Sequence, residues 1–299
     1  MTSHVAPHPL PDIEVGMEWG PARVDVTEAL NEQFLFAMQD YGGEYLPGHP
    51  PAPQAHPGTL LSLAMSGVVG FQPAEGWTGM HARDEVQLVR PVYVGETLIL
   101  HWQVTNVYEK RGRPWWVREC TITDIDGRLR LRRRIHTAFQ RDVSSGARAA
   151  SQAAQPSATP VPDSGQAYQG AWKDITLPRL LTFSPHVVGS PGWPPVNHHT
   201  SRELAERAGL KAPIAAGTQT ESYVLALLGH VLGASWWSGG ALDLRFISPT
   251  YEGDRIRACA ILTSSTAEPP HSEFEVWCER EDLSKVAAGT ATCAKSASG

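Results

Sequence analysis

The sequence has few cysteines, no long apolar run and no excess of basic residues. Its four cysteines include no CxxC pair, and a disulfide framework in a chain of 299 residues would be denser. No stretch approaches about 18 consecutive apolar residues, and no basic segment followed by an apolar run begins the sequence. A net charge of −6 supplies no basic face for nucleic acid. We therefore expect a cytoplasmic protein with reduced cysteines, no membrane segment and no nucleic-acid partner.

The composition that remains is typical of a folded globular protein, with 41% hydrophobic and 19% charged residues. A chain of this length buries about three-quarters of the surface that its extended form exposes. The sequence therefore predicts one large domain or two medium ones, and it excludes disordered and fibrous proteins.

One segment differs in composition from the rest. Between Asp142 and Gly170 the chain is rich in Ser, Ala, Gln and Pro and lacks large aliphatic residues. Such a composition is typical of a linker. We therefore divide the chain into an N-terminal unit (1–141), a linker (142–170) and a C-terminal unit (171–299), and both units have the usual size of a domain.

One motif occurs in both units. Residues 85–96 read E-V-Q-L-V-R-P-V-Y-V-G-E, and residues 243–254 read D-L-R-F-I-S-P-T-Y-E-G-D, so that both contain P-x-Y-x-G-[DE]. A Gly-Thr pair lies upstream of each copy, beginning at Gly58 and at Gly217. A repeated sequence predicts a repeated structural unit with an interface between the copies.

The order of local patterns is also the same in the two units. Apolar residues at helical spacing follow Gly217 and stop at Gly233, and a similar run follows Gly58 and stops at Gly70, which predicts a buried helix in each unit. The β-rich runs that come next predict strands over 97–108, 115–123, 129–139, 242–247, 255–263, 273–278 and 286–293. A helix followed by strands, twice over, predicts an α+β fold in which each antiparallel sheet packs against its own helix.

The segment 192–219 combines several chemically active residue types. Thr200 and Glu203 have the spacing of a capping box, which predicts a short helix that starts near Ser201 and ends before Gly209. Asn197, His198 and His199 would then lie just before the N-terminus of this helix.

The Gly217-Thr218 pair opens the longer helix that follows. The first amides of a helix have no intrahelical partner, so they can donate to a polarised carbonyl or to an oxygen anion. We therefore expect Gly217 to bind such an oxygen.

The pattern N-x-H, followed by A-G-L-K-x-P-I-A-x-G and a long apolar helix, resembles the hydratase segment of MaoC-like dehydratases and (R)-specific enoyl-CoA hydratases. The P-x-Y-x-G-[DE] strands are similar to the same family. Because both units carry this motif, the chain resembles a double-hotdog member, with two repeats that each wrap an antiparallel β-sheet around a buried helix. The resemblance spans all but the N-terminal tail, the linker and the last few residues.

The resemblance implies a hydro-lyase that acts on the 2,3-bond of a 3-hydroxyacyl or 2-enoyl thioester of CoA or a carrier protein, without a metal or a redox cofactor. His199 takes the position of the catalytic histidine, an acid and base near neutral pH. Asn197 is expected to hold the water or hydroxyl group, and the Gly217 amide to bind the thioester oxygen. The residues expected to bind the substrate are Trp193, His198, Thr218 and His56.

The sequence departs from the family pattern D-x-N-P-x-H. Pro194 stands where the aspartate belongs and Val196 where the asparagine belongs, and Ala216 occupies a position that often holds histidine in the family. Two alternatives replace the missing carboxylate: Asn197 takes its role, or a carboxylate comes from the other unit.

The N-terminal unit has no matching N-x-H loop. Its nearest counterpart is the proline-rich segment 48–58, which contains His49 and His56, and we assign this unit to substrate binding. The arginine-rich run 128–134 is either a solvated strand face or an attractor of CoA phosphates. Two adjacent histidines such as His198 and His199 do not have the spacing of a metal site.

Three functions therefore stay open. The first is the hydro-lyase, and the second is a thioesterase or a cyclase or isomerase of specialised metabolism on the same scaffold. The third is a protein that binds acyl groups without catalysis. The resemblance also leads us to expect a homodimer.

Overall fold

The computed structural model describes residues 10, 12–66, 74–142, 165–184, 193–267 and 270–294. The N-terminal half contains β1 (Glu18–Asp25), α1 (Glu28–Met38), the 3₁₀ helix η1 (Gly43–Tyr45), α2 (Pro57–Ser66), β2 (Trp77–Leu88), β3 (Thr97–Lys110), β4 (Arg113–Asp124) and β5 (Leu129–Arg141). The C-terminal half contains β6 (Ala167–Gln169), β7 (Lys173–Asp174), α3 (Leu177–Phe183), α4 (Arg202–Arg207), α5 (Gly217–Leu232), α6 (Ala234–Gly239), β8 (Gly240–Phe246), β9 (Arg255–Ala267), β10 (Pro270–Arg280) and β11 (Lys285–Ala294).

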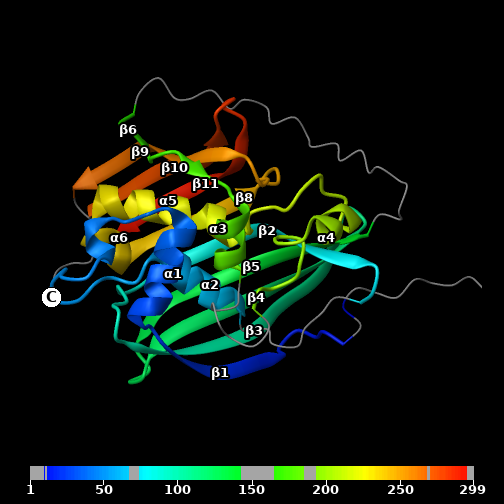
Figure 1. The fold of residues 1–299 in the computed structure, drawn as a ribbon. Coiled ribbons are helices and arrows are strands. Elements are labelled where there is room, and N and C mark those ends of the chain that lie inside the picture. Colours follow the sequence, from blue (N-terminus) through cyan, green and yellow to red (C-terminus); the bar gives the residue numbers. More distant parts are fainter. Residues whose placement is uncertain are drawn as a thin grey trace, which may run out of the picture.

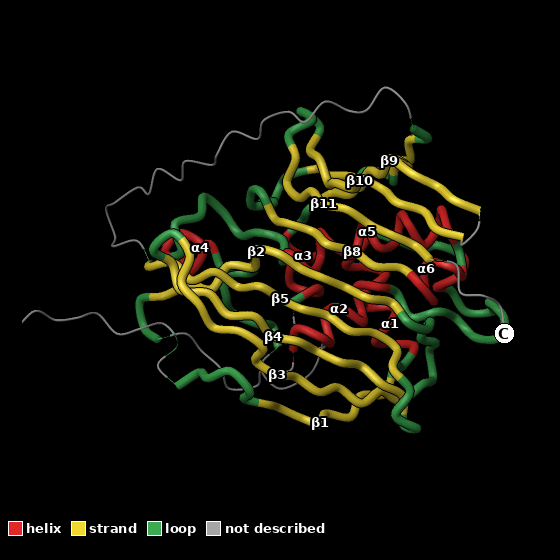
Figure 2. The backbone as a smooth tube through the Cα atoms, turned by 180° about the vertical axis from the view of Figure 1, so that it is seen from behind, coloured by secondary structure: helices red, strands yellow, loops and turns green. Residues whose placement is uncertain are grey.

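All the strands belong to one antiparallel sheet, in the order β1-β3-β4-β5-β2-β8-β11-β10-β9-β6, with β7 paired to β9. The two halves meet where β2 pairs with β8, and Glu85 lies opposite Asp243 at that junction. Helices α2 and α5 cover one face of this sheet, as Figures 1 and 2 show from opposite sides. The two predicted sheets are therefore continuous with each other, because the inner strand of each half hydrogen-bonds to that of the other.

Helix α5 is the centre of the fold. It is buried continuously from Thr218 to Gly229, and Gly233 ends it with a positive φ of 59°. A helix that is buried all round must be apolar or must satisfy its polar side chains internally. The polar side chains near its N-terminus, among them Glu221, therefore have to find partners inside the protein.

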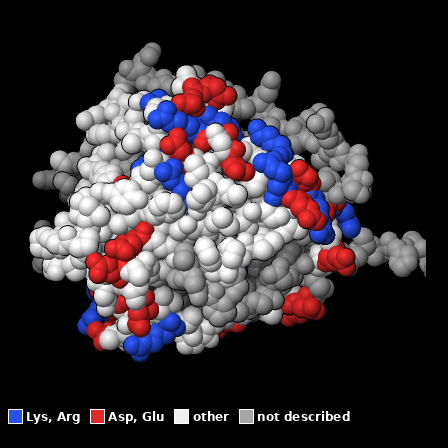
Figure 3. All heavy atoms as spheres, in the orientation of Figure 1, with Lys and Arg blue, Asp and Glu red and all other residues white. Residues whose placement is uncertain are grey.

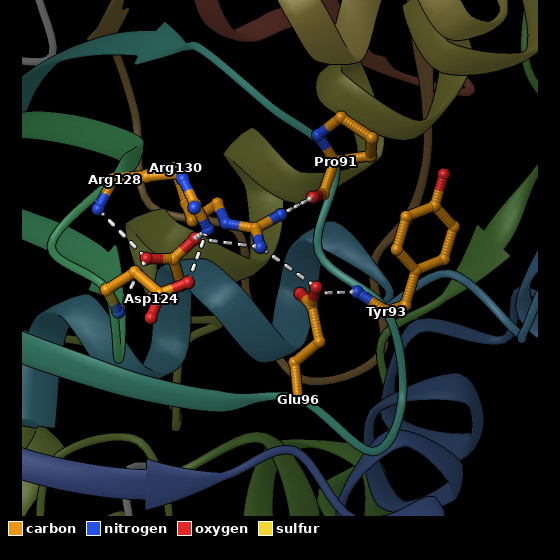
Figure 4. A network of polar contacts seen from close by, with 7 residues as sticks. Pro91, Tyr93, Glu96, Asp124, Arg128 and Arg130 are labelled. Atoms are coloured by element: carbon orange, nitrogen blue, oxygen red, sulfur yellow. Dashed lines mark hydrogen bonds and ion pairs between the residues drawn. The ribbon is translucent and has the colours of Figure 1, made fainter.

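The P-x-Y-x-G-[DE] motif forms a clamped turn in the N-terminal half (Figure 4). The Glu96 carboxylate accepts a hydrogen bond from the Tyr93 amide at 3.1 Å and one from Arg130 Nη2 at 2.9 Å. Arg130 Nη1 also donates to the Pro91 carbonyl at 2.7 Å. Gly95 has a φ of +97°, which favours glycine because it has no Cβ.

The C-terminal copy repeats this clamp with an arginine from a different strand. The Asp254 carboxylate accepts from the Tyr251 amide and from Arg280 Nε, both at 2.8 Å, and Arg280 Nη2 donates to the Pro249 carbonyl. Arg130 comes from β5, whereas Arg280 comes from the end of β10. The motif that reveals the repeat is therefore a structural clamp that fixes a turn.

Several sequence predictions need correction. The predicted linker 142–170 includes β6, which pairs with β9, so the C-terminal half begins before residue 171. The cap of α4 is Ser201, whose Oγ accepts from the Leu204 amide at 3.4 Å, whereas Thr200 bonds within its own loop. The predicted end of the first helix at Gly70 lies outside the described residues. Elements that the sequence did not predict are β1, α1, η1, β2, β6, β7, α3 and α6.

No helix in the part of the chain that the structure describes is long and apolar enough to cross a membrane. Lysines and arginines on the face shown in Figure 3 lie next to acidic residues, and a broad uncharged area separates these groups.

Candidate active site

A cleft of about 740 Å³ lies between the two halves. The N-terminal half contributes parts of β2, β4 and β5 to its wall. The C-terminal half contributes the loop 196–199, the start of α5 and the segment 246–250. The predicted residues that line this cleft are Asn197, His198, His199, Gly217 and Thr218.

The N-terminus of α5 opens into the cleft. Ala216 precedes Gly217 and supplies no side-chain cap, so the first amides of the helix keep their capacity to donate. A Cβ on Gly217 would lie 2.6 Å from His81 Nδ1 and 3.0 Å from Phe246 Cζ. The close contact with two rings therefore requires glycine at the helix start.

His199 is held with a defined ring orientation. Its Nδ1 donates to the Ile214 carbonyl at 2.9 Å, which leaves Nε2 as the acceptor of a neutral imidazole. Burial lowers the pKa of His199, although the bond to Ile214 opposes this effect. The ring is therefore neutral at pH 7 and able to accept a proton.

Asn197 shapes the loop in which His199 lies. Its Oδ1 accepts from the His199 amide at 2.8 Å, and its Nδ2 donates to Ser184 Oγ at 3.3 Å. The neighbouring His198 ring lies with its centroid 4.1 Å from that of His199, and burial lowers the pKa of His198 well below its usual value. Both neighbours thus contact His199 and help to fix the position of its ring.

A second histidine, not predicted from the sequence, faces the same helix start. His81 on β2 places Nε2 3.0 Å from Oδ2 of the buried Asp84, an ion-pair contact without hydrogen-bond geometry, and its buried Nδ1 likewise has no hydrogen-bond partner among the described residues. Burial lowers the pKa of His81, and the Asp84 carboxylate opposes this effect. A carboxylate that orients a neutral imidazole is the arrangement of a general base.

Asp84 belongs to a buried network that crosses the two halves. Arg133 on β5 donates from Nε to Asp84 Oδ2 at 2.8 Å and from Nη1 to the Leu61 carbonyl at 2.6 Å. Its Nη2 contacts Asp84 as well, and it reaches Glu221 Oε2 at 2.8 Å and Thr218 Oγ1 at 3.1 Å on α5. Asp84, Arg133 and Glu221 are fully buried.

The charges of this network balance. Burial alone would raise the pKa of Asp84, but Arg133 and His81 hold it at about 2. Burial and the nearby Asp84 carboxylate raise the pKa of Glu221 well above its usual range. The raised pKa of Glu221 favours its protonated form, whereas the lowered pKa of Asp84 favours the carboxylate that pairs with Arg133 and faces His81.

The sequence matches no protein-family model and no curated protein. Solved structures nevertheless resemble it over nearly its whole length. A MaoC-like dehydratase superposes with a TM-score of 0.70 at 16% identity and covers 94% of this chain and 98% of its own. A MaoC-like dehydratase from Phytophthora capsici superposes with a TM-score of 0.67 at 13% sequence identity, and the match covers 95% of this chain and 97% of that protein. A third match is a conserved hypothetical protein from Mycobacterium tuberculosis that is described as having a double hotdog fold. It superposes with a TM-score of 0.63 at 16% sequence identity, and the match covers 96% of this chain and 98% of that protein.

The chain has the double hotdog fold. The predicted fold is thereby confirmed, as is the likeness to MaoC-like dehydratases, which at these identities is a likeness of structure. In the double hotdog of this chain, the cleft lies at the junction of the two repeats.

The double hotdog places two predicted substrate-binding residues away from the cleft. His56 is completely buried in the N-terminal half, where Nε2 lies 3.3 Å from Asp40 Oδ2 and Nδ1 accepts from the Gly58 amide at 2.9 Å. It caps α2 and does not reach the cleft. Trp193 is 37% exposed and is absent from the cleft lining. Thr218 does line the cleft, although its hydroxyl accepts from Arg133.

The sequence leaves two roles open for the arginine-rich run 128–134, a solvated strand face or attraction of CoA phosphates, and Arg130 does not bind phosphate. Arg130 is held by Pro91, Glu96 and Asp124, so its guanidinium is not available to CoA phosphates (Figure 4). The exposed arginines that line the cleft are Arg113 and Arg207. Among the described residues, no group of three His, Cys, Asp or Glu side chains has the geometry of a metal site.

Proposed function

We propose that the protein adds water to, or removes it from, the 2,3-bond of an acyl thioester bound in this cleft. The observation that carries the proposal is that one cleft is lined by three groups: the open start of α5, His81 with its partner Asp84, and the neutral His199. The first group comes from one repeat and the second from the other. A carboxylate from the N-terminal half would thereby replace the aspartate that the C-terminal loop lacks.

The Gly217 amide would hold the thioester oxygen. When water adds to C3, negative charge moves to this oxygen as an enolate forms, and a helix N-terminus stabilises it through an unpaired amide and the helix dipole. The rings of His81 and Phe246 pack against Gly217 and limit the access of bulk water to the oxygen.

His81 would carry the proton between water and C2. In the hydration direction, Nδ1 accepts a proton from water while the water oxygen forms its bond to C3. Asp84 stabilises the resulting imidazolium, which then returns the proton to C2 of the enolate. The reverse sequence removes water. His199 Nε2 would accept a hydrogen bond from the second O–H of the water molecule, which stays on the hydroxyl product, and would thereby fix the position of the water; Asn197 positions that ring.

The thioester carrier is CoA or a carrier protein in this proposal. Arg113 and Arg207 support it, because they are exposed arginines at the cleft and guanidinium groups bind phosphates.

The decisive experiment follows the absorbance of a panel of conjugated 2-enoyl-CoA thioesters and, separately, the release of free CoA thiol. The wild type should hydrate at least one thioester, and His81→Ala should lower kcat/KM by about 10²- to 10⁴-fold. His199→Ala should lower it as well. His49→Ala is the matched control, because His49 is exposed in a proline-rich loop and does not line the cleft.

Two results would contradict the proposed reaction, and a third would contradict only the role of His81. A wild type that leaves every enoyl thioester unchanged would exclude the hydro-lyase function. Thiol release without hydration would favour a thioesterase in the same cleft. Undiminished hydration by His81→Ala would remove His81 from the chemistry while leaving the reaction assigned.

A further inference from the structure

A second buried arginine lines the cleft and makes no hydrogen bond or ion pair with the part of the chain that the structure describes. Arg118 on β4 is only 6% exposed and lines the cleft, and its Nε is buried with no hydrogen-bond partner among the described residues. None of the ion pairs and hydrogen bonds among these residues involves its guanidinium. The nearest aromatic contact is Trp116, whose ring centroid lies 4.7 Å from Cζ.

Arg133 shows what a buried arginine requires. Its guanidinium contacts two acids, a hydroxyl and a carbonyl. Arg118 has none of these, and an unpaired charge taken out of water destabilises the protein. Burial and the nearby positive charge of Arg133 lower the pKa of Arg118 to about 10, so the group is still charged at pH 7.

The groups around Arg118 do not neutralise it. Asp84 is bound to Arg133 and His81, and burial raises the pKa of the Cys120 thiol to about 12, so that this thiol is neutral. Arg133 adds positive charge. The cleft therefore has a positively charged inner wall whose counterion is not supplied by the described part of the chain.

We propose that Arg118 binds a carboxylate on the acyl part of the ligand, so that the substrate is a carboxyacyl thioester. A carboxylate matches the two parallel N–H groups of a guanidinium. The charge belongs to the acyl part because Arg118 lies on the buried, helix-facing side of β4, whereas the bulky CoA phosphates would meet the exposed Arg113 and Arg207.

This inference rests on the proposed function, because it takes the ligand to be a thioester. Its test measures binding alone and needs no turnover. The probes are saturated thioesters that a hydro-lyase leaves unchanged: succinyl-, glutaryl- and adipyl-CoA. Each is compared by calorimetric titration with the methyl-ended thioester of the same carbon number, butyryl-, pentanoyl- or hexanoyl-CoA.

The wild type should bind at least one carboxylated probe about 10- to 100-fold more tightly than its methyl-ended counterpart, the range for a hydrogen-bonded charge pair. Arg118→Gln should lose this preference, and Arg118→Lys should keep part of it. Arg132→Gln is the matched control, since Arg132 is exposed on the opposite face of the sheet. Equal binding of each pair by the wild type, or an unchanged preference in Arg118→Gln, would overturn the inference.

Two further measurements separate the inference from the proposed function. If the protein binds neither class of thioester, free succinate, glutarate and adipate are titrated. Saturable binding that Arg118→Gln abolishes supports the carboxylate site even when thioester chemistry has failed. Without ligand, Arg118→Met should unfold at a higher temperature than the wild type, because it removes an uncompensated charge. A lower unfolding temperature would show that Arg118 is compensated and would count against the site.

Discussion

The two halves share one architecture and differ at a few inward-facing positions. The offset that matches Glu85 with Asp243 also matches Asp84 with Leu242, and both of these side chains are buried. In the same way, Glu221 on α5 corresponds to Ser62 on α2. The ion network therefore occurs once, although the scaffold occurs twice.

The helix starts differ in a related way. In the N-terminal half, His56 Nδ1 accepts from the Gly58 amide and thereby occupies the start of α2. In the C-terminal half, Ala216 precedes Gly217 and leaves the start of α5 open. The comparison indicates that one repeat keeps a sealed helix N-terminus for stability while the other presents an open one to a ligand.

The largest effect on stability should come from the buried network of Asp84, Arg133 and Glu221, which joins the two halves and has no counterpart in the repeat. Arg133→Met leaves the Asp84 carboxylate buried without its main partner, and we expect it to lower the free energy of unfolding by about 3–5 kcal/mol. Urea unfolding measures this change. Arg132→Met, its exposed neighbour, should change stability by less than about 0.5 kcal/mol. Similar losses in the two variants would show that the network does not hold the halves together.

The paired glycines test the difference between the helix starts. Gly217→Ala keeps the backbone amide but pushes a methyl group against the His81 ring. Because displacing a catalytic group by about 1 Å can cost about 10²-fold, the variant should lower turnover of a thioester substrate by about 10²-fold. Gly58→Ala meets His56 Nδ1 and Met38 Cγ at 3.0 Å and should cost about 1–3 kcal/mol of stability with turnover kept. Equal losses of turnover in both variants would contradict the assignment of one active helix start.

The two histidine–carboxylate pairs should respond differently to acid. Burial lowers the pKa of His81, so the neutral base survives below its usual pKa of about 6.5, and kcat/KM should fall only at lower pH as the ring protonates. Asp84 opposes this lowering, so Asp84→Asn should move the acid limb of the pH profile to still lower pH. Asp40→Asn, which alters the corresponding pair with His56, should leave the limb in place. If Asp40→Asn also shifted the acid limb of the pH profile, the assignment of the His81–Asp84 pair as the catalytic one would be contradicted.

The smallest effect concerns the end of α5 that lies away from the cleft. Hydrogen bonding to Asp40, together with Glu44, raises the pKa of His230. A raised pKa contributes stability below the unfolded value, about 6.5, and this contribution is lost as pH rises through the folded value. The ring is 41% exposed, so we discount the effect to about 0.5 kcal/mol. The melting temperatures of wild type and His230→Gln should therefore converge as pH rises above about 6.5. A difference in melting temperature that does not change with pH would show that the charge of His230 does not contribute to stability.

The sequence predicted the elements whose pattern is local. The apolar period located α5, and the matched turns located the repeat. The alternation in β5 also carried a signal that the prediction did not use, because Arg133 falls on the same face as Leu131 and Ile135 and is buried with them. A charged residue on an apolar face is the sign of an internal network.

The His81–Asp84 pair could not be read from such a pattern. Residues three apart on a regular strand point to opposite faces. A shift in the pairing of β2 with β5 between His81 and Arg83 brings both side chains to the inner face. Such a β-bulge depends on the partner strand, so it is a property of the folded sheet.

The pairing of β2 with β8 within one chain also determines which substitutions the junction of the two repeats can acquire. In a symmetric dimer of two identical subunits, every substitution appears twice and both sides of the interface change together. In this chain the two repeats are continuous, so a substitution in β2 alters one side of the junction and leaves β8 as it was. A residue such as Asp84 can therefore be acquired without its mirror image, and the single junction can hold an asymmetric site.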